Sequence, residues 1–182
     1  MHQSNPLKNW LPYKIIVNNE QALCRWLHLE DKSFSEPFFD ETISKCKSFD
    51  INSKHFIPVS NLQILPEWAE NISSVKPTAF IFHVSRCGST LLSQLLGINE
   101  QHIVLSEVPL FDELLRLPYR ISNSGNIHAE NVLKEAIQFY GQKRKGNETS
   151  LFIKTDSWHV FFWKQIRKMY PEVFLLPPVC SR

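Results

Sequence analysis

One short segment carries residue types suited to binding an anion. Residues 80–92 read FIFHVSRCGSTLL, with Gly88, Ser89 and Thr90 at the point where an apolar run gives way to a helical pattern. The first N–H groups of a helix are unpaired, and its dipole adds about half a positive charge there, so phosphate or sulfate is attracted. The guanidinium of Arg86 is a planar fork that fits the oxygens of either anion. The segment therefore predicts an anion-binding loop.

The loop differs from the phosphate-binding loop of nucleoside-triphosphate enzymes. That motif has a glycine five positions before a Gly-Lys-Ser/Thr triplet. Here His83 stands at the first glycine position and Ser89 at the lysine position. Because the parts that hold magnesium and the γ-phosphate are incomplete, the sequence argues against a nucleotide kinase.

Instead, the segment resembles the phosphosulfate-binding loop of sulfotransferases, which use 3′-phosphoadenosine 5′-phosphosulfate as donor. In that family a strand leads into Lys or Arg, any residue, Gly, Ser or Thr, and Thr, followed by an apolar helix. Residues 105–112 (LSEVPLFD) and 152–159 (FIKTDSWH) also resemble a bacterial branch of the family. The likeness covers roughly residues 78–176, and three ordered segments are more specific than one loop.

The resemblance implies transfer of a sulfuryl group to a hydroxyl or amine acceptor, whose identity the sequence does not predict. Arg86 takes the place of the catalytic cation, and Glu107 that of the catalytic base. Asp156 and His159 are alternative bases, since they follow a strand end. The resemblance implies no catalytic metal. The residues expected to bind the donor are Ser85, Arg86, Cys87, Gly88, Ser89 and Thr90.

The sequence departs from the family pattern after the fourth expected strand. Members carry an Arg there, and later a Ser, that bind the 3′-phosphate of the donor. Here Leu176 stands in the place of the Arg, and residues 177–182 read PPVCSR. We therefore expect a C-terminally truncated copy that binds the donor weakly and turns over little. The alternative is a non-catalytic binding or interaction protein that retains a phosphate-binding loop.

From residue 76 onward, strand and helix patterns alternate. This alternation predicts an α/β fold, with a parallel sheet flanked by helices, as in the P-loop-like sulfotransferase fold that the resemblance implies. The expected strands are 78–84, 102–106, 151–154 and 173–176, and the expected helices are 90–96, 109–117, 129–140 and 157–169.

Residues 1–75 form a second region, a mixed annex of unknown role, with a boundary near 73–77 and the sulfotransferase-like domain at 76–182. Its expected elements are a helix over 19–30, a short helix over 40–46, a strand over 54–59 and a helical turn over 66–68. Its aromatic side chains either cover one side of the sheet or form part of an acceptor pocket. They are Trp10, Trp26, Phe38, Phe39 and Trp68.

Three further side chains have two interpretations each. Lys154, on an otherwise apolar strand, either points to a ligand or protects a sheet edge. Cys87 either fills the turn or is a reactive thiol beside a cation and a helix start. His159 is either structural or functional, whereas His83 is read as a satisfied core histidine.

Composition narrows the class of protein. With 182 residues, 43% hydrophobic and 21% charged, the chain is an ordinary globular protein. A net charge of +2 without a dense basic block argues against nucleic-acid binding. The four cysteines form no C-x-x-C pair, and neither a secretory signal nor a membrane span is predicted. We expect a reduced, cytoplasmic protein whose partners are the nucleotide donor and an acceptor.

Overall fold

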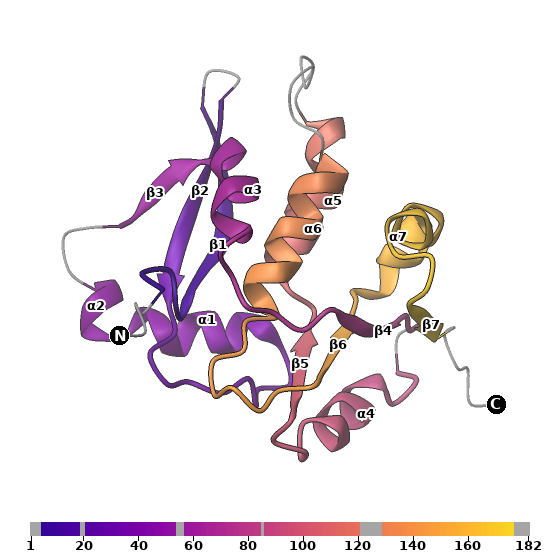
Figure 1. Cartoon of the computed structure of the whole chain (residues 1–182). Coiled ribbons are helices and arrows are strands. Elements are labelled where there is room, and N and C mark those ends of the chain that lie inside the picture. Colours follow the sequence, from indigo (N-terminus) through magenta and orange to yellow (C-terminus); the bar gives the residue numbers. More distant parts are fainter. Residues whose placement is uncertain (1–4, 19–20, 54–56, 85, 121–128, 177–182) are drawn as a thin grey trace.

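The structure, a computed structural model, describes residues 5–18, 21–53, 57–84, 86–120 and 129–176 (Figure 1). The described residues form a three-stranded antiparallel sheet in the order β1-β2-β3 and a four-stranded parallel sheet in the order β5-β6-β4-β7. Helices flank the parallel sheet (Figure 1). The predicted α/β class is confirmed.

The parallel sheet follows the sequence prediction closely. Its strands are β4 (Pro77–Ile81), β5 (His102–Ser106), β6 (Ser150–Lys154) and β7 (Phe174–Leu176). β4, β5 and β6 are largely buried, as near-continuous apolar runs in a parallel sheet require. β7 ends at Leu176, the position where the sulfotransferase pattern has an Arg. Residues 177–182 lie outside the described residues.

The helices lie on opposite faces of this sheet. Figure 1 shows α4 (Ser89–Leu96) on one side of it and α5 (Pro109–Arg116), α6 (Ala129–Tyr140) and α7 (Trp163–Met169) on the other. The chain therefore leaves neighbouring strands β4 and β6 toward opposite faces, and such a switch opens a crevice at the carboxyl ends of the strands. None of the helices in the described ranges is long and apolar enough to cross a membrane.

Two helical predictions need refinement. The helix expected over 157–169 is a 3-10 turn, η3 (Ser157–Phe162), followed by α7, and its N-cap residue is Asp156. A further 3-10 turn, η2 (Leu117–Tyr119), continues α5. The Phe162 backbone, at φ −99° and ψ 6°, separates η3 from α7.

The antiparallel sheet overturns the helix predicted over 19–30. Strands β1 (Trp10–Asn18) and β2 (Gln21–His28) pair as a hairpin, with Asn18 opposite Gln21 and Trp10 opposite His28. Along β2, alternate residues Ala22, Cys24 and Trp26 are buried, which is the period of two of a strand. The apolar spacing fitted a helix because Leu23 and Leu27 interrupt that alternation in the sequence.

The other elements of the N-terminal region are short. β3 (Val59–Asn61) begins where the strand predicted over 54–59 was expected to end, and residues 54–56 lie outside the described residues. The predicted short helix is confirmed as α1 (Phe39–Lys47), and the predicted helical turn as α3 (Leu65–Ala69). The structure adds α2 (Asp50–Ser53) and η1 (Leu62–Ile64).

One continuous apolar core joins the two regions. α5 and α6 pack on β1, where the Tyr140 hydroxyl donates to the Pro12 carbonyl at 2.7 Å and the Ile15 N–H donates to Glu113 Oε2 at 2.6 Å. At Gly141 a Cβ would lie 2.6 Å from the Val75 carbonyl oxygen, so only glycine allows this approach. The N-terminal region is therefore fixed beside the sheet that carries the predicted loop.

Candidate functional site

The carboxyl ends of three parallel strands meet at one edge of the sheet, and backbone hydrogen bonds join the segments that follow them. The N–H of Glu107, after β5, donates to the Lys154 carbonyl at 2.8 Å. The N–H of Thr155, after β6, donates to the Ile81 carbonyl of β4 at 3.1 Å. This edge brings together the predicted loop, the predicted base Glu107 and the segment that starts at Lys154.

The predicted loop has a backbone suited to an anion. Gly88 is the N-cap of α4 at φ +81°, a conformation that glycine adopts without strain. Because Gly88 has no side chain, the first turn of α4 lacks the capping oxygen that a Ser or Asp would supply. Arg86 also has a positive φ of 62°, a rarely populated conformation that in proteins concentrates at functional sites. Arg86 is exposed, whereas Ser89 is buried.

Cys87 lies half-buried within the loop. Burial acts to raise the pKa of its thiol, but hydrogen bonds from the N–H and the hydroxyl of Ser89 outweigh it, so that the pKa is lowered. The loop therefore already stabilises one anion, the thiolate. Ser85, also predicted to bind the donor, lies outside the described residues.

Lys154 is the centre of the site. It is only 1% exposed, and its Nζ lies 2.5 Å from Glu107 Oε1 and 3.4 Å from Thr90 Oγ1. A buried ammonium group requires such a counter-charge, since taking it out of water is costly. Lys154 thus links the predicted base to the predicted loop. The signal in the sequence was a lysine on an otherwise apolar strand, and the structure places it facing the loop.

Glu107 lies at the end of β5 with a positive φ of 55°. Its side chain is 21% exposed, so one side of the carboxylate faces solvent while the other meets Lys154. His83 Nε2 lies 3.3 Å from the same Oε1 atom. His83 is buried, as expected. However, its ring faces this carboxylate, and its Nε2 makes no well-aligned hydrogen bond with the described residues.

A second polar cluster adjoins Glu107. His159 Nε2 lies 3.3 Å from Asp112 Oδ1 and 3.6 Å from Asp156 Oδ2. Burial, with repulsion from Glu107 and Asp112, raises the pKa of Asp156 to about 6. Burial also lowers the pKa of His159, although Asp112 opposes the shift. Of the two alternative bases, Asp156 is partly exposed and His159 is buried, so Asp156 is the more accessible to solvent.

The ligand atoms of Asp112, Asp156 and His159 all lie within 4.8 Å of one another, a spacing that a metal ion could bridge. However, the Nδ1 atom of His159 accepts a hydrogen bond from the Asp156 N–H at 3.2 Å. The proton of a neutral His159 therefore resides on Nε2, the nitrogen that faces both carboxylates. A metal ligand must present a lone pair instead, so the arrangement fits a hydrogen-bonded cluster better than a metal centre.

The N-terminal aromatic residues were expected either to cover one side of the sheet or to form part of an acceptor pocket. They differ in burial. Trp26 packs on Trp68 and Phe139, and Phe39 packs on Tyr140, all within the core. Phe38, by contrast, is 41% exposed, and its ring lies over Lys154 Nζ. The sequence gave no signal that singled out Phe38 from its neighbours.

Comparisons with known proteins do not assign the chain to a family. No family model matches the sequence, and searches of curated proteins and of solved structures found no match.

Proposed function

We propose that the chain is a sulfotransferase-like protein that binds 3′-phosphoadenosine 5′-phosphosulfate at residues 86–90. The observation that carries the proposal is the junction of β4 and α4. There a glycine-capped helix start lies beside the buried ammonium of Lys154, which reaches both Thr90 and Glu107.

The charges at this junction favour an anion. The first turn of α4 offers N–H groups at the positive end of the helix dipole. Arg86 in the loop is exposed. The Nζ of Lys154 lies 3.4 Å from the hydroxyl oxygen of Thr90. The donor would be held by residues 86–90, and when bound it supplies the sulfuryl group.

In the proposed reaction an acceptor oxygen or nitrogen attacks the sulfur of the donor. The new bond from acceptor to sulfur forms as the bond from sulfur to the bridging phosphate oxygen breaks, and that electron pair leaves with the phosphate. Arg86 and the start of α4 offset the charge on the leaving phosphate. Glu107 takes the acceptor proton, since its carboxylate is partly exposed beside the loop.

One observation favours the alternative, a non-catalytic protein that binds phosphate or sulfate. Glu107 Oε1 is already engaged by the buried Lys154 ammonium at 2.5 Å, as a carboxylate that only balances a buried cation would be. Under the alternative, Glu107 is structural and only the loop has a function. The two candidates differ in whether binding leads to transfer.

Equilibrium binding of the donor to wild type and Arg86→Ala tests the proposal. Loss of a charge-assisted contact predicts an affinity lower by about tenfold to a hundredfold. Arg120→Ala is the matched control, because Arg120 is an exposed cation beyond the far end of α5. Binding that Arg86→Ala leaves unchanged would contradict the proposal.

Formation of 3′-phosphoadenosine 5′-phosphate with a panel of hydroxyl and amine acceptors separates the two candidates. Under the enzyme proposal, Glu107→Gln abolishes product formation and leaves donor binding measurable. Donor binding by wild type without any transfer would favour the binding protein.

A further inference from the structure

The N-terminal region contributes one side chain to the sheet edge. Phe38 immediately precedes α1, and its ring centroid lies 5.0 Å from Lys154 Nζ. Lys154 lies at the end of β6, which is 116 positions away in the chain (154 − 38). The contact therefore depends on how the two regions pack against each other.

The ring occupies a defined place around the ammonium group. An ammonium has three N–H donors and no acceptor, and Lys154 Nζ meets Glu107 Oε1 at 2.5 Å and Thr90 Oγ1 at 3.4 Å. The face of an aromatic ring carries negative charge and attracts a cation within about 6 Å. Phe38 thus supplies a third favourable neighbour of the buried ammonium group.

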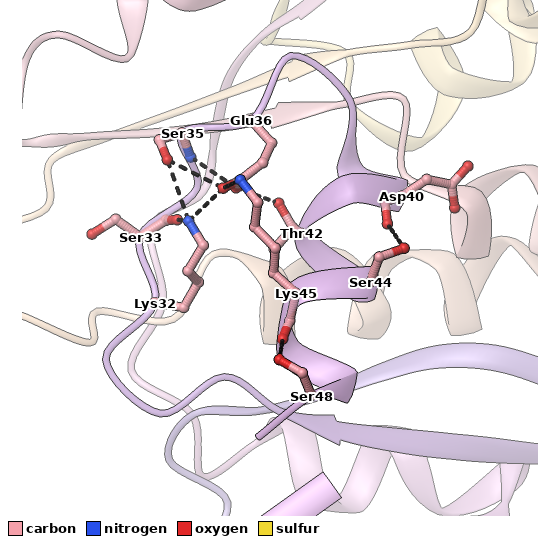
Figure 2. Close-up of polar contacts among 9 residues, drawn as sticks. All are labelled: Lys32, Ser33, Ser35, Glu36, Asp40, Thr42, Ser44, Lys45 and Ser48. Atoms are coloured by element: carbon pink, nitrogen blue, oxygen red, sulfur yellow. Dashed lines mark hydrogen bonds and ion pairs between the residues drawn. The ribbon is translucent and has the colours of Figure 1, made fainter. Parts of the chain in front are cut away.

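An ion cluster around the buried side chain of Glu36 lies just before Phe38 in the chain (Figure 2). The Glu36 side chain is 3% exposed, and its Oε1 lies 2.6 Å from Lys32 Nζ and 3.0 Å from Lys45 Nζ. The Thr42 hydroxyl donates to Oε2 at 2.8 Å. Figure 2 shows these side chains converging on Glu36 from α1 and from the segment before it. The cluster therefore anchors the chain two residues before Phe38.

The residues on either side of Phe38 leave it little freedom. Pro37, between Glu36 and Phe38, has a φ fixed by its ring. Phe39, the next residue, is 2% exposed and packs on Tyr140 in the core. An anchored glutamate and a buried phenylalanine thus bracket the exposed ring.

We infer that Phe38 is a positioning residue of the site: it holds the Lys154 ammonium against Thr90 and Glu107 and shields it from water. The Glu36 cluster holds Phe38 in position. The benefit to donor binding rests on the proposed function. The shielding of Lys154 does not, and it can be measured without any ligand.

Reaction of Lys154 with an amine-selective reagent, followed by peptide mass spectrometry, tests the shielding directly. Exposed Lys143 in the same sample serves as the internal standard. We expect Phe38→Ala to raise the labelling rate of Lys154 relative to Lys143 by about tenfold or more, because removing the ring opens one side of the ammonium. Phe174→Ala is the matched control, since Phe174 is 73% exposed at the start of β7.

Two further substitutions keep the test decisive. Phe38→Leu covers Lys154 without an aromatic face, so its labelling rate should lie between those of wild type and Phe38→Ala; it is also the variant to use if Phe38→Ala does not fold. Glu36→Gln should raise Lys154 labelling, because it weakens the ion cluster that holds Phe38 in position. Glu130→Gln should not raise it, because Glu130 forms an exposed 3.7 Å pair with Lys168. Lys154 labelling at the wild-type rate in folded Phe38 variants would overturn the inference.

Donor affinity gives the second readout. We expect Phe38→Ala to weaken binding of 3′-phosphoadenosine 5′-phosphosulfate by about tenfold and Phe38→Trp to restore it, since tryptophan is the best cation–π partner. If wild type binds no donor, the proposed function fails, and labelling alone still decides the inference. If wild type binds the donor and the Phe38 variants match it in affinity and labelling, only the inference fails.

Discussion

Two shielded carboxyl groups, one in each region, have opposite pKa shifts. Burial acts to raise the pKa of Glu36 in the N-terminal region, but hydrogen bonds from Lys32, Lys45 and Thr42 outweigh it and lower the pKa to about 2. At the sheet edge, burial and the nearby carboxylates of Glu107 and Asp112 raise the pKa of Asp156 to about 6. Cations and a hydroxyl group satisfy the carboxylate of Glu36, whereas burial and two nearby carboxylates disfavour the charge on Asp156.

The difference separates a structural cluster from a candidate site. The charge of Glu36 is compensated within the protein by Lys32, Lys45 and Thr42. Such a cluster suits a structural role in holding Phe38. The acidic groups near Asp156 remain under-compensated, and carboxyl groups with strongly shifted pKa values concentrate at functional sites.

Thiol reactivity should show the largest contrast between the regions. Burial raises the pKa of Cys24 to about 12 and, as the chief cause, that of Cys46 to about 11, whereas the pKa of Cys87 in the loop is lowered. Since the thiolate is the nucleophile, we expect native Cys87 to be alkylated about a thousandfold faster than Cys24 or Cys46 at pH 8. Peptide mapping after timed alkylation measures the rates, and similar rates at all three would remove the contrast.

Glu107→Gln should have the largest effect on stability. It leaves the buried Lys154 ammonium without a counter-charge, which typically costs about 3 kcal/mol. Urea unfolding measures the loss, and adding Lys154→Met should restore most of it because the unpaired charge is then gone. Glu130→Gln should change the unfolding free energy by less than about 0.5 kcal/mol, since its ion pair with Lys168 is exposed. A Glu107→Gln protein as stable as wild type would show that the ion pair does not matter.

Glu36 should stabilise the fold in a pH-dependent way. Its pKa in the folded state, about 2, is below the ordinary value of 4.5, so its contribution is full above pH 4.5 and is lost as the pH falls toward 2. We expect Glu36→Gln to lower the unfolding free energy by about 2 kcal/mol at pH 7. Unfolding across this pH range should show the variant and wild type converging near pH 2; a constant difference would contradict the assignment.

Asp156 should behave in the opposite way. Its folded-state pKa, about 6, is above the ordinary 3.8, so its unfavourable contribution is absent below pH 3.8 and grows until the pH passes 6. Asp156→Asn, which retains a good N-cap residue for η3, should gain about 1 kcal/mol at pH 8 and nothing at pH 3.5. A stability loss at pH 8 would mean that this carboxylate is compensated like Glu36.

The parallel sheet was predictable because its signals are local and redundant. Near-continuous apolar runs such as residues 78–82 specify strands buried on both faces, and the helical spacing of Val132, Leu133 and Ala136 specifies α6. The hairpin of β1 and β2 was not predictable from residues 19–30, because Leu23 and Leu27 give that segment a spacing compatible with either period. Its strand identity comes from pairing with β1 on one side and β3 on the other, while β1 packs against α5 and α6.

The candidate site was predictable in part, for a similar reason. The loop at Arg86–Thr90 follows a strand end and is predicted from adjacent residues, whereas Glu107 is predicted from the resemblance to sulfotransferases. The Lys154 ion pair with Glu107 and the Phe38 ring above it depend on packing between distant segments. No local pattern encodes that Phe38, rather than Phe39, faces the site.

If the ligand binds at the edge formed by the loop and Lys154, it should protect that edge. Amide hydrogen exchange with and without 3′-phosphoadenosine 5′-phosphosulfate measures this protection. We predict that the donor slows exchange at residues 86–92, at Glu107 and at Lys154–Asp156. A cavity of about 540 Å³ lies elsewhere, between β4, α6 and the segment after α7, and is lined in part by Lys134 and Tyr170. Protection confined to that cavity, or no protection at the loop, would contradict binding at the loop and Lys154.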